Sequence, residues 1–250
     1  VIILIIGMSA PCMAEQAPVF GGASDLLPFS YKENGVVKGF FSDLFLEAAH
    51  RTGFEVSLRL FPLKRLWEYL ESGEIDGCVT LVRTKAREKY LIYSTSPLLK
   101  SYTLVFVKKG REFLYNSVDD LVGKEIGVLI GWKTENKSFE QAINEGRLKI
   151  EEVSQPDQNL KKLMLDRIDC FIGTELLTWY RANELGVAEH LASLETPIAE
   201  HNVLIAVRKQ TANIADPRGF IEKMSAAIDE VVSDGTYDKI KKRYKVTSLK

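Results

Sequence analysis

Hydrophobic positions along this chain switch repeatedly between the period of a strand and the period of a helix. Apolar residues alternate with polar ones from Phe54 to Leu60, which is the pattern of a half-buried strand. From Leu63 to Leu70 the apolar side chains recur at helical spacing, and Gly73 ends that helix. Another apolar strand is predicted from Ile75 to Val82. Strands that alternate with helices in this way favour an α/β fold with largely parallel sheets.

The same alternation continues toward the C-terminus. Strands are predicted at residues 125–131, 148–153, 168–173 and 203–207, and helices lie between or after them. Signals for helix ends are also present. These signals are N-caps at Ser42, Asp157 and Asp216, a capping box from Ser117 to Asp120, Pro217 at a first helical position, and terminating glycines at Gly53, Gly73 and Gly235.

Two segments of the chain resemble each other. The segment from Gly73 to Arg87 has a partial echo from Asp166 to Thr174, and in each a helix ends, a short apolar strand follows, and polar residues appear where the strand stops. Open α/β sheets bind ligands beyond the carboxyl ends of their strands. The two strand ends therefore predict two lobes that face one ligand. The segment from Gly73 to Arg87 also supplies two arginines and two threonines, whose N–H and hydroxyl groups are suited to binding a carboxylate.

No segment rich in proline, glycine and serine separates the two lobes. This favours extended hinge strands, which we expect near residues 98–103 and 197–203. Lobe 1 is then predicted to contain residues 15–98 and 203–250. Lobe 2, with the hinge strands, is predicted to contain residues 99–202.

The composition is that of an ordinary globular protein: 250 residues, 46% hydrophobic and 27% charged, with a formal net charge of −1. This balance argues against a nucleic-acid partner. Residues 1–14 differ, since an uncharged apolar run precedes Cys12-Met13-Ala14, as in a signal peptide and its cleavage site. We therefore expect residues 1–14 to be a signal-peptide remnant and the protein to be periplasmic. A buried strand and a lipid anchor at Cys12 are the alternatives, and Pro11 disfavours the anchor.

Beyond residue 14 the sequence offers few groups for redox, metal or nucleophilic chemistry. Cys78 and Cys170 each follow an Ile-Asp unit within a predicted strand, so we expect two buried, unreactive thiols rather than a disulfide. The three histidines lack the spacing of a catalytic triad or a metal site. Neither a phosphate-binding loop nor a dinucleotide fingerprint is present. We therefore expect no metal and no cofactor.

An ordered set of motifs links the chain to a known family. The set comprises Pro28-Phe29, Gly39-Phe40, Gly73 to Asp76, Thr84 to Arg87, Ser94 to Pro97, Asp119 to Gly131, and Asp234 to Tyr244. Over Ala17–Tyr244 it resembles the family 3 bacterial extracellular solute-binding proteins, the periplasmic receptors of ABC importers for polar amino acids. The resemblance implies the type II two-lobed periplasmic-binding-protein fold, with a mostly parallel sheet in each lobe and two hinge crossings. It also implies a small-molecule solute, an ABC permease as partner, and a monomer.

The resemblance assigns roles in lobe 1. Arg87 matches the arginine that grips the ligand carboxylate, and Thr80 matches a hydroxyl position in the same loop. Arg83 stands where relatives carry an apolar residue and adds positive charge to the cleft. Arg65 is expected to point into the cleft. Leu26 occupies the position of a cleft-wall aromatic, and Phe29 lies on the same loop.

In lobe 2 the chain departs from the family pattern. Trp132 and Lys133 replace a threonine pair, and Thr174 stands where relatives carry the aspartate that binds the α-ammonium group, with Glu175 beside it. A buried ammonium without a partner would cost several kcal/mol. An anionic or carboxylate-bearing solute with an apolar portion against Trp132 is therefore at least as compatible as an α-amino acid.

Two other functions share this fold. Similar lobes form the extracellular sensor domains of signalling kinases. A few family members resemble cyclohexadienyl dehydratases, and an enzyme of that kind would need a general acid, for which Glu175 is the candidate. Trp67 and Trp179 fit the apolar faces of helices and are expected to belong to the core. The sequence favours a receptor that is not an enzyme.

Overall fold

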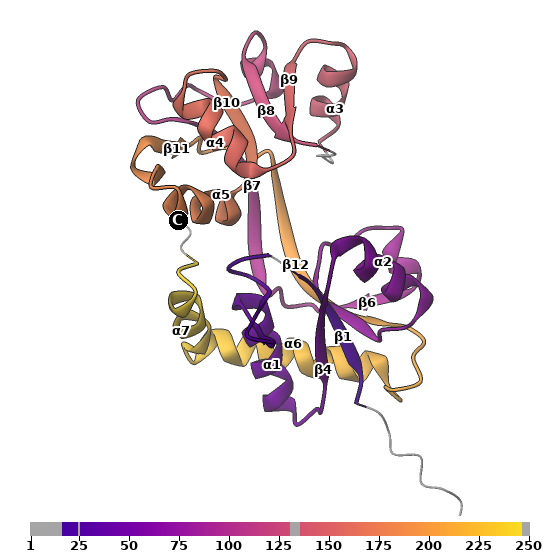
Figure 1. The fold of residues 1–250 in the computed structure, drawn as a ribbon. Helices are drawn as coiled ribbons and strands as arrows, with labels where there is room; N and C mark the ends of the chain where they lie inside the picture. The colour runs from indigo at the N-terminus through magenta and orange to yellow at the C-terminus, as the bar shows by residue number, and fades with distance from the viewer. Residues whose placement is uncertain (1–16, 25, 131–135, 247–250) are drawn as a thin grey trace, which may run out of the picture.

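The computed structural model describes residues 17–24, 26–130 and 136–246. Two lobes are joined by a pair of long strands, β7 (Leu99–Lys108) and β12 (Ala199–Arg208), as Figure 1 shows. The predicted signal peptide and Cys12 fall within residues 1–16, which lie outside the described residues.

Lobe 1 is built from both ends of the chain. Its N-terminal elements are β1 (Val19–Ala23), β2 (Tyr31–Glu33), β3 (Val36–Lys38), α1 (Phe40–Thr52), β4 (Ser57–Phe61), α2 (Leu63–Ser72), β5 (Gly77–Leu81), the 3₁₀ turn η1 (Arg87–Lys89) and β6 (Leu91–Tyr93). Two C-terminal helices, α6 (Pro217–Ser233) and α7 (Thr236–Arg243), complete it, and α6 runs across its base (Figure 1).

Lobe 2 contains the middle of the chain. Its elements are the 3₁₀ turn η2 (Val118–Leu121), β8 (Glu125–Leu129), α3 (Lys137–Asn144), β9 (Lys149–Val153), α4 (Pro156–Met164), β10 (Cys170–Thr174), α5 (Glu175–Glu184), the 3₁₀ turn η3 (Ala188–His190) and β11 (Leu191–Ser193). The alternation of strands and helices predicted from the hydrophobic pattern is therefore confirmed in both lobes.

One continuous strand order, β4-β1-β5-β12-β7-β10-β8-β9, runs through the molecule. β1 is parallel to β4 and β5, and β8 is parallel to β9 and β10. The two long strands are antiparallel to each other only from Leu99↔Val203 to Thr103↔Ala199. Beyond that segment β7 pairs with β10, and β12 pairs with β5. The chain therefore crosses between the lobes twice, on two paired strands, as the fold class predicts.

Each lobe has its own hydrophobic core. In lobe 1, α1 packs against α6, and Phe20 contacts Phe45 and Phe220 at ring centroid distances of 4.9 and 5.5 Å. In lobe 2, Val105 and Ile126 are among the fully buried residues around which the sheet and helices close. The two lobes also meet at α5, which contributes Leu176 to the lobe 1 cluster and Trp179 to a lobe 2 cluster.

The Ile-Asp units that open the two echoing segments have matching structural roles. The backbone N–H of Val19 donates to Asp76 Oδ2 at 2.7 Å, while the Asp76 N–H donates to the Val19 carbonyl. In lobe 2 the N–H of Glu125 donates to Asp169 Oδ2 at 2.8 Å, and the Asp169 N–H donates to the Glu125 carbonyl. Each aspartate thus fixes the first residue of the neighbouring parallel strand. These contacts lie at the N-terminal ends of the strands, away from the carboxyl ends where a ligand is expected.

Two expected N-caps are wrong. Ser42 lies inside α1, fully buried with its Oγ 3.3 Å from Ser30 Oγ, because the helix begins after Gly39. Asp157 lies one residue inside α4, where Gln155 is the N-cap, and its carboxylate instead binds Arg181 of α5. The other signals are confirmed: Asp216 accepts from the Gly219 N–H at 3.0 Å, and Gly53 and Gly73 end their helices with φ of 73° and 89°.

Both described cysteines are buried and free. Burial raises the pKa of the Cys78 thiol to about 11 and that of the Cys170 thiol to about 12. A thiolate is therefore strongly disfavoured at both positions near neutral pH, in agreement with two unreactive thiols.

Candidate functional site

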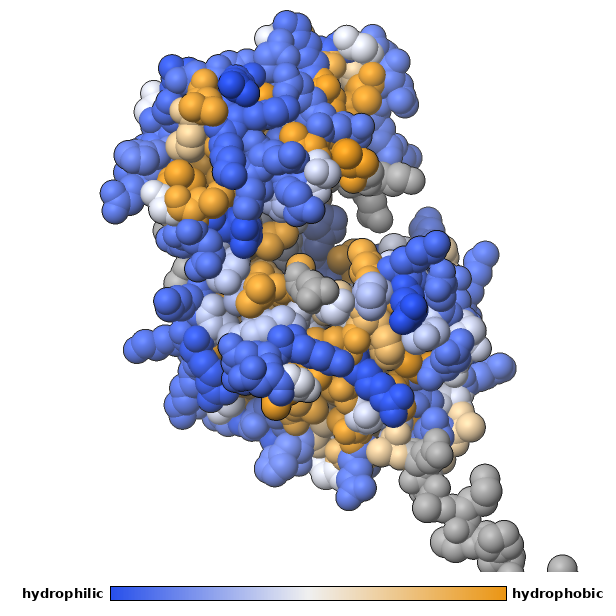
Figure 2. Space-filling view, in the orientation of Figure 1, coloured by the Kyte–Doolittle hydropathy of each residue, from blue (hydrophilic) through white to orange (hydrophobic). Residues whose placement is uncertain are grey.

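The space-filling view shows a hollow between the two lobes (Figure 2), and the strand ends that carry the predicted site pair with the hinge strands, Leu81 with Leu204 and Thr174 with Thr103. β5 ends at Leu81 and leads into the loop that reaches Arg87. β10 ends at Thr174, and α5 starts at the next residue. The two ends approach the hinge from opposite lobes, as expected for a ligand site between lobes.

Arg87 opens the short turn η1 and has an aromatic support. Its guanidinium carbon lies 4.2 Å from the centre of the Trp67 ring, and its Nη1 donates to the Val82 carbonyl at 3.5 Å. No acidic side chain of the described residues forms an ion pair with it. A stacked guanidinium keeps its N–H edge available, and that edge suits a carboxylate.

Trp67 packs against the core, as expected, and also contacts Arg87. The helical spacing of α2 predicts a core residue, and its ring is indeed partly buried against the cluster that contains Leu66 and Leu70. The exposed part of the ring carries Arg87. The spacing of apolar residues in a helix predicts which face packs inward. It cannot predict that an arginine from a different loop will contact one of those residues.

Arg83 is held less tightly. Its guanidinium carbon lies 5.2 Å from the centre of the Tyr93 ring, and its Nε lies 3.8 Å from Glu88 Oε1, beyond hydrogen-bonding distance. The side chain is 52% exposed. Tyr93 itself is buried, which raises the pKa of its hydroxyl, and that hydroxyl has no hydrogen-bond partner within the part of the chain that the structure describes.

The remaining lobe 1 candidates differ in exposure. Thr80 is half-buried near the end of β5, and Arg65 is exposed on α2. Leu26 is half-buried and bridges to Ser30. Phe29 is only 5% exposed and stacks on Phe41 with the ring centres 5.3 Å apart, so its side chain lies within the lobe 1 core.

In lobe 2, Thr174 is exposed and stands at the N-cap of α5 without a capping hydrogen bond from its side chain. Its neighbour Glu175 is 4% exposed. Across the strand pair Thr174 faces Thr103, whose hydroxyl lies 3.5 Å from His201 Nε2. Hydroxyl and imidazole groups thus lie at the strand end where relatives are expected to carry an aspartate. Trp132 and Lys133 lie outside the described residues.

A cavity of about 460 Å³ lies beside the hinge strands. It is lined by Val82, Arg83, Ser94, Thr95, Glu200, His201, Asn202 and Leu204. The hinge histidine and Tyr93 could not be assigned from sequence, because strand partners about a hundred residues apart bring them to this place.

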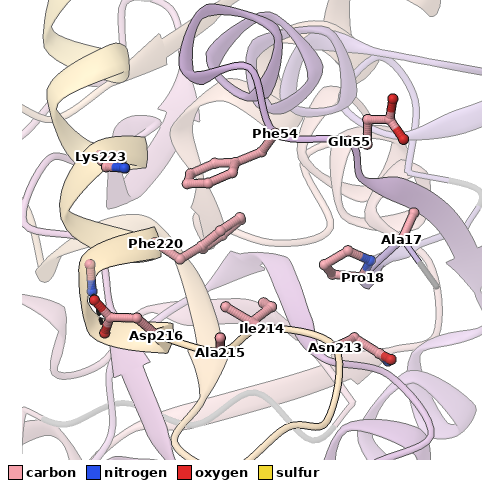
Figure 3. A pocket seen from close by; sticks show the side chains of 11 residues that line it. Ala17, Pro18, Phe54, Glu55, Asn213, Ile214, Ala215, Asp216, Phe220 and Lys223 are labelled. Carbon is pink, nitrogen blue, oxygen red and sulfur yellow. Dashed lines mark hydrogen bonds between the residues drawn. The ribbon is translucent and has the colours of Figure 1, made fainter. Parts of the chain in front are cut away.

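Another cavity, of about 520 Å³, lies on lobe 1 away from the loop of Arg87 (Figure 3). Phe54 and Phe220 form its apolar floor, with ring centres 4.5 Å apart, and Lys223 lies 5.6 Å from the Phe54 ring. Asp216 is occupied as the N-cap of α6. This cavity contains none of the candidate site residues.

Two classes of site are not found in the described ranges. No group of three or more histidine, cysteine or acidic side chains there could hold a metal ion. Likewise, no described helix combines the length and the apolar character required to cross a membrane.

These observations describe a two-lobed α/β protein with a cavity beside its hinge strands, to which lobe 1 contributes Arg83. The family model of the bacterial extracellular solute-binding proteins, family 3, matches residues 19–247, and the chain belongs to that family.

Three similar proteins illustrate the range of the family. The probable amino-acid-binding protein YxeM of Bacillus subtilis is 25% identical over 224 residues, covering 90% of this chain and 82% of its own. A putative sensor protein of Shewanella frigidimarina is 23% identical over 181 residues. The aligned region covers 72% of this chain and 28% of that protein. Among solved structures, substrate-binding domain 2 of Lactococcus lactis GlnP, in an open conformation, has a TM-score of 0.68 at 22% identity, covering 95% of this chain and 98% of that one.

Proposed function

We propose that this protein is an exported, periplasmic receptor that captures a small carboxylate-bearing solute between its lobes and delivers it to an ABC permease. The class of solute is an amino acid or a related organic acid. The receptor acts as a monomer and is not an enzyme. Family membership supports solute binding, and one observation carries the choice of a carboxylate.

That observation is the state of Arg87. Its guanidinium is stacked on Trp67, donates to the Val82 carbonyl at 3.5 Å and interacts with the Tyr90 hydroxyl, and no acidic side chain of the described residues forms an ion pair with it. A cation that the fold supports but does not neutralise is suited to a ligand anion. Charge-assisted, bidentate contacts of this kind are among the stronger hydrogen bonds in proteins.

Closure of the lobes follows from the same architecture. We propose that residues 15–98 and 203–250 move together as one body and that residues 99–202 move as the other. The hinge is the short antiparallel pairing of residues 99–103 with residues 199–203. A solute held by Arg87 on one side and by the start of α5 on the other would stabilise the closed form. A ligand shifts such an equilibrium only by its difference in affinity for the two forms.

The first test is a thermal-shift screen of amino acids, organic acids and amines, since a ligand that binds the folded state raises its stability. Arg87→Ala is expected to weaken binding of the best hit by about a hundredfold, the loss of one strong charged contact. Lys85→Ala removes a charge from the same loop and serves as the matched control. Unchanged affinity in Arg87→Ala would show that the carboxylate assignment is wrong.

A signalling receptor is the second candidate. The similarity to the putative sensor protein supports it, because this chain spans about a quarter of that protein, as one domain of a larger receptor would. The genes that neighbour this one discriminate the two: permease and ATPase genes support transport, whereas a kinase or cyclase gene supports signalling. Production of a new compound from prephenate or arogenate, abolished in Glu175→Gln, would instead show an enzyme.

A further inference from the structure

We infer that the solute is a small dianion, such as a dicarboxylate, with one anionic group on Arg87 and the second on Arg83 at the mouth of the hinge cavity. This inference rests on the proposed carboxylate receptor and specifies its substrate class. It assigns a ligand role to Arg83 and to the cavity of about 460 Å³.

The two arginines are presented in similar ways. Arg87 lies over Trp67 and Arg83 lies over Tyr93, so each cation has an aromatic surface on one side. Neither is closely neutralised, since the nearest acid to Arg83 is Glu88 at 3.8 Å, too far for a hydrogen bond. An arginine needed only for a surface ion pair would have a closer partner. Two such cations in one loop match two anionic groups.

Val82 connects the two arginines to the cavity. Its carbonyl accepts from Arg87 Nη1, and the same residue lines the hinge cavity together with Arg83. Val82 therefore adjoins both the guanidinium of Arg87 and the hinge cavity.

The charges around the cavity leave Arg83 as its available cation. Glu200, the acid among the lining residues, forms a loose ion pair with Lys100 on the paired hinge strand, at 3.6 Å, which is comparable to the pair of Arg83 with Glu88 at 3.8 Å. His201 is positioned by Thr103, and Ser94 Oγ accepts from the Ile205 N–H at 3.1 Å. The hydroxyl of Ser94 and the exposed amide of Asn202 are polar groups that line the cavity together with Arg83. An anionic group fits this set better than an apolar one.

The opposite lobe gives the complementary reason. The exposed Thr174 faces Thr103, and Thr103 lies next to His201, while the carboxylate nearest in sequence belongs to Glu175, which is buried at the start of α5. At this strand end the accessible groups that an α-ammonium would meet are therefore hydroxyl and imidazole groups rather than the expected aspartate. A dianion without an amino group avoids the cost of a buried, unpaired ammonium.

The test is titration calorimetry of the full chain with succinate, glutarate and adipate, and with butyrate as the monocarboxylate probe. At least one dicarboxylate should bind more tightly than butyrate. Arg83→Gln should weaken that dicarboxylate by about tenfold to a hundredfold, the effect of one charged contact, and leave butyrate within about twofold. Lys85→Gln should leave both ligands unchanged. Arg83→Lys keeps the charge without the planar fork and should give an intermediate loss.

Failure of all three dicarboxylates to bind better than butyrate would overturn the inference. So would Arg83→Gln if it weakened both kinds of ligand equally, or neither. The proposed receptor is tested separately, because it depends on Arg87. If the best solute requires Arg87 but not Arg83, the proposed carboxylate receptor stands and the inference of a dianion is wrong. Circular dichroism and melting temperatures of the variants identify any loss that is due to unfolding.

Discussion

The two lobes begin their central strands in the same way and end them differently. Asp76 and Asp169 each hold the first residue of the neighbouring parallel strand through a pair of hydrogen bonds. At the other end, β5 continues into a loop with two aromatic-backed arginines, whereas β10 passes directly into α5 at Thr174. The repeated part is therefore the scaffold, and the divergent part is where we propose that the ligand binds. Similar sequence patterns in the two lobes do not imply similar chemistry at their strand ends.

Asp76 and Asp169 differ in the number of chain segments that their side chains hold together. Asp76 is 5% exposed and also accepts from Asn213 at 3.1 Å and from Thr211, so it ties the segment before α6 to the lobe 1 sheet. Asp169 is exposed, and its side chain accepts one hydrogen bond, from Glu125. The same structural element is thus more strongly connected in lobe 1.

The largest expected effect is on stability. Asp76→Ala leaves buried donors unpaired and should lower the free energy of unfolding by about 3 kcal/mol, whereas Asp169→Ala should lower it by about 1 kcal/mol. Urea denaturation measures both, with an unchanged dependence on urea as the sign that the unfolded state is unaltered. Equal losses would show that the additional contacts of Asp76 contribute nothing.

The next effect concerns the strand end in lobe 2. Thr174→Asp places a carboxylate at the position that the family resemblance assigns to the ammonium group. The ratio of glutamate affinity to glutarate affinity should rise by about tenfold, the effect of one new charged contact. Thr174→Asn is the uncharged control of the same shape. If both variants give the same ratio, the difference between the lobes does not set ligand class.

The smallest effect concerns the support of Arg87. Trp67→Leu removes the aromatic surface and should weaken the best ligand by about threefold to tenfold, the range of a partly exposed cation–π contact. Trp67→Phe should recover most of the affinity, because it keeps an aromatic face. Melting temperatures separate this effect from lost packing in lobe 1. Equal affinities for the leucine and phenylalanine variants would argue against a positioning role.

Much of the fold could be predicted from the sequence because its signals are local. The alternating apolar pattern, the N-cap at Asp216 and the glycine after α2 each depend on a few neighbouring residues. The two incorrectly predicted N-caps, Ser42 and Asp157, are residue types that favour the N-cap position, but both lie inside their helices. The buried contact of Ser42 with Ser30 and the ion pair of Asp157 with Arg181 are tertiary interactions that override that local preference.

The site could be predicted only in part. Arg87 and Thr174 follow from a motif, yet their roles remain predictions until a ligand is measured. The supports of the site, Trp67 under Arg87 and Tyr93 under Arg83, come from other elements and have no signature at the level of spacing. His201 reaches Thr103 only because β7 and β12 pair at the hinge. Contacts across distant segments require the assembled sheet.

The double crossing of β7 and β12 also affects the order in which the molecule can be assembled during synthesis. Lobe 2 consists of one uninterrupted stretch, so all of its core is available once β12 has emerged from the ribosome. Lobe 1 is split, since Phe20 and Phe45 pack with Phe220 and Met224 of α6, and Asp76 binds Asn213. Its N-terminal part therefore exposes an unfinished apolar surface until α6 is available, while lobe 2 requires no segment beyond β12 and can fold first.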